Sequence, residues 1–274
     1  MKTKKRFLSI AVNVLVWVIS IILITPLVLI LINSFKTSQA SAEMSLRLPE
    51  TIQLENFKVV FERGKLGVTF LNSLTYSVFS VILCTLTSAM AAFVLSRNRS
   101  KANKIIYFII VLGMAMPINF IALMKVMQSL DIINKRIGII LLYAAIQTPF
   151  NVFLIYSFVG KIPREIDEAA IIDGCSPLQL FFSIIIPLIK PVLVTVMVLT
   201  FLNTWNEYIL PLYFLGNSDK WPMTLAVYNF FGMYFRDWNL VCADIVLTSL
   251  PVVIVYLLGQ KHIVSGMTAG AVKG

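Results

Sequence analysis

The residues in this sequence best suited to bind a ligand are amides and aromatic side chains that recur at helical spacing. Tyr143, Gln147 and Asn151 are four residues apart, so they would share one face of a helix. Amides hydrogen bond to hydroxyl groups, so this face could line a path for a polar solute. Further amides that could join this path are Asn119, Asn203 and Asn206. The same amides could instead bond across helices with no ligand present.

The sequence lacks the residue patterns that are typical of catalytic and cofactor sites. The single histidine is His262 and the three cysteines show no CxxC spacing, which argues against a zinc or redox site. An intramembrane enzyme would need paired acids or a nucleophile with its base, and neither constellation occurs. The phosphate-binding pattern G-x-x-x-x-G-K-[ST] is also absent, so the chain is expected to bind no ATP, metal or other cofactor itself.

The composition points to the membrane. Of the 274 residues, 58% are hydrophobic and 13% are charged, and the mean hydropathy is +0.87. The apolar residues form long uncharged runs, which excludes a soluble enzyme, a disordered chain and a repeat solenoid. The net charge of +10 comes from short basic segments beside these runs, a pattern that orients membrane helices and does not indicate nucleic-acid binding.

Six uncharged stretches reach the length of about 20 residues that a helix needs to cross a hydrocarbon layer. The sequence therefore predicts an all-α integral membrane protein with six transmembrane helices. The predicted helices are Phe7–Phe35, Val68–Ser96, Ile105–Met124, Gly138–Gly160, Ile184–Leu210 and Asn239–Gln260. The uncharged stretch Trp221–Phe235 is too short to cross and is expected to be re-entrant or to lie at the outer surface.

Two short segments contain basic residues and no acid, which places them in the cytosol by the positive-inside rule. These segments comprise Lys2, Lys4, Lys5 and Arg6, and then Arg97, Arg99, Lys101 and Lys104. An even number of helices puts the C-terminus in the cytosol as well. The first apolar run is too long for the core of a cleaved signal peptide, so we expect it to remain as a helix.

A short cytoplasmic helix is predicted between the fourth and fifth membrane helices, over residues 161–174. Pro163 suits its first position, where the missing N–H has no partner to lose. Three acids follow at the positive end of the helix dipole, and Gly174 can adopt the left-handed conformation that ends a helix.

A second helix is predicted to follow directly. Ser176, Pro177 and Gln179 form a capping box with proline at the first helical position. Pro187 and Pro191 then interrupt the chain as it re-enters the membrane. The two helices would make a compact helix-turn-helix on the cytosolic face, unless the segment is only a well-capped loop.

The residues of this segment resemble the EAA motif of binding-protein-dependent ABC transporter permeases. The matching residues are Glu168, Ala169, Ala170, Asp173, Gly174 and Pro187, with Pro191 beyond them. Cys175 stands where such motifs commonly carry a smaller residue such as alanine, a departure of little consequence.

Further matches indicate the carbohydrate importers of that family, similar to the smaller membrane subunit of the maltose transporter. The matching segments are Asn72–Leu74, Ala91–Phe93, Trp205–Tyr208, Pro211–Leu212 and the tail Ser265–Gly274. The resemblance implies three regions. These are a first helix and outer loop over residues 1–67, a permease core over 68–260 and a cytoplasmic tail over 261–274.

The resemblance implies the permease subunit of an ATP-driven importer for an oligosaccharide or related sugar or polyol, in the bacterial inner or plasma membrane. Its partners would be a second, homologous permease, two ABC ATPase subunits that hold ATP and magnesium, and an extracytoplasmic sugar-binding protein. The short cytoplasmic helix would be a coupling helix that docks in a cleft of one ATPase. Ile166, Ala169 and Ala170 would supply an apolar face for this docking.

The resemblance also implies that the tail, with Gly266, Gly270 and Lys273, reaches the ATPase pair.

An ion-coupled secondary transporter is the alternative function. It would need carboxylates inside the membrane, whereas nearly all acids of this chain lie at or beyond the ends of the predicted helices.

Overall fold

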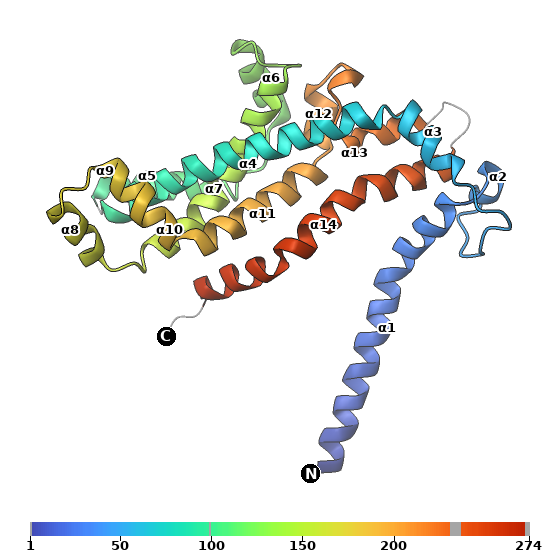
Figure 1. Cartoon of the computed structure of the whole chain (residues 1–274), viewed down its shortest axis with the longest axis horizontal. Coiled ribbons are helices and arrows are strands. Elements are labelled where there is room, and N and C mark those ends of the chain that lie inside the picture. The colour runs from blue at the N-terminus through green and yellow to red at the C-terminus, as the bar shows by residue number, and fades with distance from the viewer. Residues whose placement is uncertain (1, 99, 231–236, 272–274) are drawn as a thin grey trace. The chain divides into compact units, whose positions relative to one another are not determined.

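The structure is a computed structural model that describes residues 2–98, 100–230 and 237–271 (Figure 1). Within these residues the regular structure is entirely helical, which confirms the all-α class. The α-helices are α1 (Lys2–Ser34), α2 (Ser38–Ser41), α3 (Glu55–Arg63), α4 (Leu66–Arg97), α5 (Lys101–Leu112), α6 (Phe120–Ser129), α7 (Arg136–Val159), α8 (Arg164–Ile172), α9 (Pro177–Gln179), α10 (Ile186–Leu188), α11 (Lys190–Asn206), α12 (Ile209–Phe214), α13 (Met223–Ala226) and α14 (Trp238–Ala271). A π-helix, η1 (Leu180–Ile185), and two 3-10 helices, η2 (Ser218–Lys220) and η3 (Val227–Phe230), complete the set.

Several helices are long and apolar enough to cross a membrane. Among the described residues there are 4 such helices, or up to 5 if a bent pair counts as one crossing. The four are Ile10–Ser34, Leu66–Arg97, Arg136–Val159 and Trp238–Lys261, and they match the first, second, fourth and sixth predicted helices. The structure therefore has helices long and apolar enough to cross a membrane at four of the six predicted positions.

The third predicted crossing, Ile105–Met124, differs from the structure, which divides it into α5 and α6. Helix α5 has 12 residues, so its rise is about 18 Å, well short of a hydrocarbon layer. Pro117 lies in the break and has no N–H to continue a helix. Asn119 then starts α6 because its side chain accepts a hydrogen bond from the N–H of Ala122 at 3.0 Å.

The fifth predicted crossing, Ile184–Leu210, is not one straight helix in the structure. The predicted helix starts at Ile184, but Pro177–Leu188 and Lys190–Asn206 meet at a bend of 79°. Ile189 lies at the bend, between Pro187 and Pro191, and each proline removes a donor from the helical ladder. The apolar run thus turns at Ile189, and the long straight helix of this region is α11.

The chain divides into two compact units, each with its own internal contacts. The first unit comprises Met1–Thr69 and Ala226–Leu250. In it, the buried amide of Asn56 donates to the carbonyl of Ser34 at 2.9 Å and that of Lys36 at 2.8 Å. Asn239 in turn donates to the side-chain oxygen of Asn56 at 2.8 Å. This network joins the end of α1 to α3 and to the start of α14.

The second unit comprises Phe70–Leu225 and Pro251–Gly274 and contains the predicted coupling segment and path residues. Helix α7 packs against both α5 and α11. One apolar core gathers Val159, Ala170, Ile185 and Val196, which come from α7, α8, η1 and α11. In Figure 1, α8 and α9 lie together at one end of this unit, next to the C-terminal end of α4.

Candidate functional site

Helix α8 forms where the sequence predicts the coupling helix. It begins at Arg164, one residue later than predicted. Pro163 is therefore the N-cap residue (φ −55°, ψ 140°) and not the first residue of the helix. Proline is tolerated here because neither position needs its N–H. Glu165 and Asp167 occupy the first turn, where the helix dipole favours negative charge.

The end of α8 is a turn that favours glycine. Gly174 follows the C-cap residue Asp173 and has φ +83°, in the left-handed region. Its N–H donates to the carbonyl of Ile171 at 3.0 Å, and the N–H of Cys175 donates to the carbonyl of Ala170 at 3.0 Å. These two bonds make a Schellman motif, which satisfies carbonyls that the helix leaves without partners. The predicted helix stop at Gly174 is confirmed.

The predicted capping box of the second helix is also confirmed. The N–H of Gln179 donates to the hydroxyl of Ser176 at 3.3 Å, and the N–H of Ser176 donates to the side-chain oxygen of Gln179 at 2.8 Å. After this first turn the chain continues as the π-helix η1, which the sequence did not predict. Pro187 lies at the start of α10, with its side chain exposed. π-Helical turns are rare and often mark functional sites.

The faces of α8 differ from the predicted docking face. Ala170 is only 5% exposed and belongs to the core of its own unit, while Ile166 is half-buried. Ala169 and Glu168 are exposed, as predicted for a docking surface. The most exposed apolar side chain of α8 is Ile172, at 85%, which was not among the predicted docking residues. A helical-wheel pattern shows that two faces exist, but it does not show which one the rest of the protein covers.

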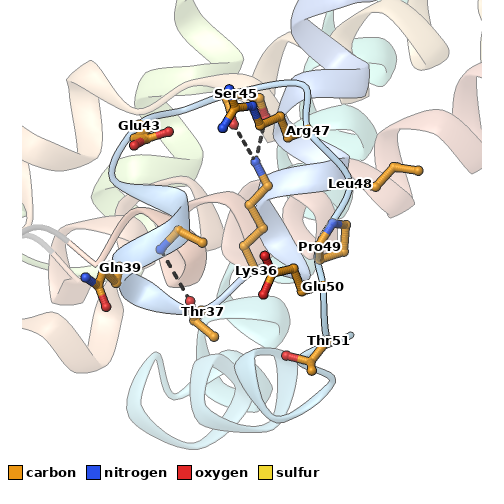
Figure 2. Close-up of a pocket in the computed structure, with 11 residues that line it drawn as sticks. Lys36, Thr37, Gln39, Glu43, Ser45, Arg47, Leu48, Pro49, Glu50 and Thr51 are labelled. Carbon is orange, nitrogen blue, oxygen red and sulfur yellow. Dashed lines mark hydrogen bonds between the residues drawn. The ribbon is translucent and has the colours of Figure 1, made fainter.

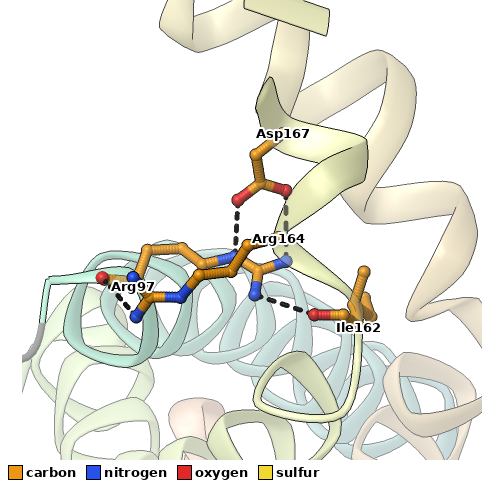
Figure 3. Close-up of polar contacts among 4 residues, drawn as sticks. All are labelled: Arg97, Ile162, Arg164 and Asp167. Carbon is orange, nitrogen blue, oxygen red and sulfur yellow. Dashed lines mark hydrogen bonds and ion pairs between the residues drawn. The ribbon is translucent and has the colours of Figure 1, made fainter. Parts of the chain in front are cut away.

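Asp167 of α8 forms an ion pair with Arg97, the last residue of α4 (Figure 3). The Nε of Arg97 lies 2.6 Å from Oδ2 of Asp167, and its Nη2 donates to Oδ1 at 3.1 Å. Its Nη1 donates to the carbonyl of Ile162 at 3.0 Å, and Arg164 donates to the carbonyl of Arg97 at 3.1 Å. From the sequence, Arg97 was expected only to orient the chain in the membrane, because a separation of 70 positions carries no local signal of pairing.

The structure brings two of the predicted path residues into contact. The amide of Asn203, exposed on α11, donates to the side-chain oxygen of Gln147 on α7 at 3.3 Å. Asn151 is fully buried, and its amide donates to the hydroxyl of Thr200 at 3.0 Å and to the sulfur of Cys84 at 3.1 Å. Asn151 thus bonds to α4 and α11, as expected of a residue that holds helices together.

The other predicted path residues have different surroundings. Tyr143 is 4% exposed and packs in an apolar core of the second unit with its hydroxyl buried. Asn119 is exposed and caps α6. Asn206 is exposed at the end of α11, where the helix breaks. Glu207 shapes this break, since its carboxylate accepts the N–H groups of Ile209 at 2.7 Å and Leu210 at 3.1 Å.

The predicted tail contacts fall partly beyond the described structure. Gly266 and Gly270 lie within α14, which continues to Ala271. Lys273 lies outside the described residues. Nowhere in the described part of the chain do three His, Cys, Asp or Glu side chains gather as a metal site would require.

A separate cavity of about 410 Å³ lies in the first unit, in the loop after α1 (Figure 2). Its lining includes Lys36, Glu43, Arg47 and Glu50, whose charges balance. The ammonium of Lys36 donates to the carbonyl of Ser45 at 2.7 Å and to its hydroxyl at 3.0 Å. The loop therefore uses its buried cation to hold its own backbone.

Comparison with known proteins places the chain in a family. Residues 84–269 match the model of the binding-protein-dependent transport system inner membrane component. The chain is 35% identical, over 93% of its length and 94% of the relative, to a probable starch degradation products transport system permease protein of Thermoanaerobacterium thermosulfurigenes. It is 33% identical, over 97% of its length and 89% of the relative, to a diacetylchitobiose uptake system permease protein of Streptomyces coelicolor.

A solved structure shares the fold along nearly the whole chain. It is the crystal structure of a bacterial ABC transporter involved in the import of the acidic polysaccharide alginate, at a TM-score of 0.84 and 25% identity. The match covers 94% of this chain and 97% of the other. The chain accordingly belongs to the inner membrane components of binding-protein-dependent transport systems, which are transport permeases and not catalytic subunits.

Proposed function

We propose that this chain is the membrane-spanning permease subunit of an ATP-driven ABC importer for an oligosaccharide or a related sugar. The observation that carries the proposal is the segment from α8 to α9, a compact helix-turn-helix with α8 ended by a glycine turn and α9 started by a capping box, in a chain of this family. The names of the relatives, which include permeases for starch products and for diacetylchitobiose, support a carbohydrate substrate. They lend no support to the ion-coupled alternative.

Six crossings of the inner membrane, with both termini in the cytosol, complete the proposed topology. Helix α5, the break after it and α6 would together make the third crossing, and the bent pair around Ile189 would make the fifth. Irregular backbone at membrane depth is tolerated where protein covers it or where it lines a passage. The regions 1–67, 68–260 and 261–274 would then be the first helix with its outer loop, the permease core and the cytoplasmic tail.

The proposed partners are a second permease, two ABC ATPases and an extracytoplasmic sugar-binding protein. ATP and magnesium would bind to the ATPases. Docking on one ATPase would use the exposed side of α8 and its end, with Glu168 and Asp173 as charged contacts and Ala169 and Ile172 as apolar ones. Ala170 would seat this segment in the core of its unit, Gly174 would form the turn that ends α8, and Pro187 would shape the chain after the segment. Alternating access would follow when ATP-driven closure of the ATPase pair displaces α8.

The composition of the native complex tests this function. The tagged chain is purified in mild detergent from its own cell, and the co-purifying chains are identified. A P-loop ATPase and a second permease of this family are expected. A stable wild-type chain that co-purifies with neither an ATPase nor a second permease would contradict the proposal.

The proposed substrate path includes Gln147 and Asn203, with the exposed Asn119 and Asn206 as further candidates, whereas the buried Tyr143 and Asn151 support it by packing. Removing one hydrogen bond to substrate changes binding by about 0.5–1.5 kcal/mol, so Gln147→Ala and Asn203→Ala should each raise the sugar concentration for half-maximal uptake about two- to tenfold. Asn151→Ala is the matched control. It should lower the free energy of unfolding by about 1 kcal/mol and leave the sugar concentration for half-maximal uptake unchanged. The reverse pattern would assign substrate contact to Asn151 instead.

The tail is proposed to reach the ATPase pair. Deleting residues 265–274 should lower ATP-driven uptake without reducing the amount of chain inserted in the membrane, because the deletion removes no predicted crossing. Uptake is measured in whole cells and normalised to the chain detected in isolated membranes. Wild-type uptake after the deletion would show that the tail has no such role.

A further inference from the structure

The ion pair between Arg97 and Asp167 joins two segments that the chain does not connect directly. Helix α8 follows α7 after a short turn and precedes α9, so the backbone already ties it to both. Helix α4 ends at Arg97, 70 positions before Asp167. The link from α8 to α4 must therefore be made by side chains.

The geometry of this link is more specific than that of a surface ion pair. The guanidinium faces both carboxylate oxygens: Nη2 donates a hydrogen bond to Oδ1, and Nε lies within ion-pair distance of Oδ2 (Figure 3). The side chains of Arg97 and Asp167 are only 14% and 13% exposed, so water competes little for the pair. The third nitrogen holds the carbonyl of Ile162 in the turn before α8. A lysine could make one of these contacts but not all three.

The link is made from both sides. Arg164, at the first position of α8, donates to the carbonyl of Arg97 at the last position of α4. The end of one helix and the beginning of the other are thus joined by contacts in both directions. By contrast, the apolar contacts of Ala170 with its core are non-directional and do not by themselves set the orientation of α8.

We infer that Arg97 and Asp167 are positioning residues that clamp the coupling helix to α4, so that a displacement of α8 moves α4 with it as one rigid piece. The inference rests on the proposed function, in which an ATPase displaces α8. It adds a route by which that displacement reaches α4, which the backbone does not join directly to α8. Arg97 would then serve in coupling as well as in orienting the chain.

A distance measurement tests the clamp without any ATPase. Spin labels are placed at Ile172→Cys on α8 and Val94→Cys on α4, whose native side chains are 85% and 55% exposed. Cys175 is half-buried and is replaced by alanine, while Cys84 and Cys242 are buried and shielded from the label. The full chain should give one narrow distance distribution, and Asp167→Asn should broaden it.

Glu165→Gln is the matched control, because it removes a carboxylate from the same helical turn at an exposed position. It should leave the distribution narrow. An Asp167→Asn chain with the same narrow distribution as Glu165→Gln would overturn the clamp, whatever the fate of the proposed function.

Coupling in the assembled importer gives a second, independent readout. In proteoliposomes with both permeases, the ATPases and the binding protein, Asp167→Asn should retain the ATPases and hydrolyse ATP. The number of ATP molecules used per sugar imported should rise at least about fivefold, the lower end of typical coupling between sites. Arg97→Lys should raise it less. A ratio equal to that of wild type, or loss of the ATPases from the complex, would refute a transmitting role. Absence of ATPases from the wild-type complex would instead refute the proposed function.

Discussion

Replacing Gly174 with proline should abolish ATP-driven sugar uptake while the chain still inserts in the membrane. Proline fixes φ near −65°, whereas Gly174 has φ +83°, and it removes the N–H that bonds the carbonyl of Ile171 at 3.0 Å. A local penalty of about 3 kcal/mol would undo the turn that ends α8, so uptake should fall by roughly two orders of magnitude. Purified in mild detergent, the variant should keep the second permease and lose the ATPase.

Substitutions of graded severity at the same position separate backbone conformation from size. A Cβ added at Gly174 meets nothing within 4 Å, so alanine probes only the left-handed conformation, at about 1–2 kcal/mol. Asparagine tolerates that conformation better than alanine does. Uptake should therefore fall in the order glycine, asparagine, alanine, proline. If asparagine proves as damaging as proline, the ATPase needs the absence of a side chain and not the turn.

Replacing Gly259 with alanine should destabilise the second unit. An ideal Cβ at this position of α14 lies 2.8 Å and 2.9 Å from the two methyl carbons of Val198 on α11. Val198 is β-branched and has one strongly preferred rotamer in a helix, so it cannot swing aside. We expect the free energy of unfolding to fall by about 1–3 kcal/mol, the usual range for overpacking. Thermal unfolding of the wild-type and variant chains in detergent measures this difference.

A smaller residue at position 198 tests whether the clash with Val198 causes the loss of stability. The double variant Gly259→Ala with Val198→Ala returns the space that the new methyl group needs, and it should recover most of the lost stability. Gly67→Ala is the matched control, because a Cβ there meets nothing within 4 Å and alanine favours helix. Equal stability of Gly259→Ala and Gly67→Ala would show that α14 and α11 do not approach this closely.

Much of the fold is predictable from the sequence because single helices follow local patterns. Helices α4 and α7 each begin within two residues of the positions expected from apolar run length. The break between α5 and α6 and the π-helix η1 were missed, because hydropathy does not register hydrogen-bond pattern. Pro117 and Asn119 are the local signals that would have divided the third apolar run.

Within the candidate site, the capping features were predictable and the contacts were not. Ser176, Gln179 and Gly174 act on residues within four positions of themselves, so their roles can be deduced from spacing. The burial of Ala170 and the pairing of Arg97 with Asp167 depend on which distant segments pack beside α8. Such long-range information is not present in helical periodicity.

The energy source of uptake distinguishes an ABC importer from an ion-coupled transporter. The chain, its partner permease, the ATPases and the binding protein are reconstituted in sealed proteoliposomes, and import of a labelled oligosaccharide is followed. We predict import that requires ATP and the binding protein, and that stops in the Gly174→Pro variant. Import that instead follows an imposed proton or sodium gradient, and proceeds without ATP, would show that the chain is not an ABC permease.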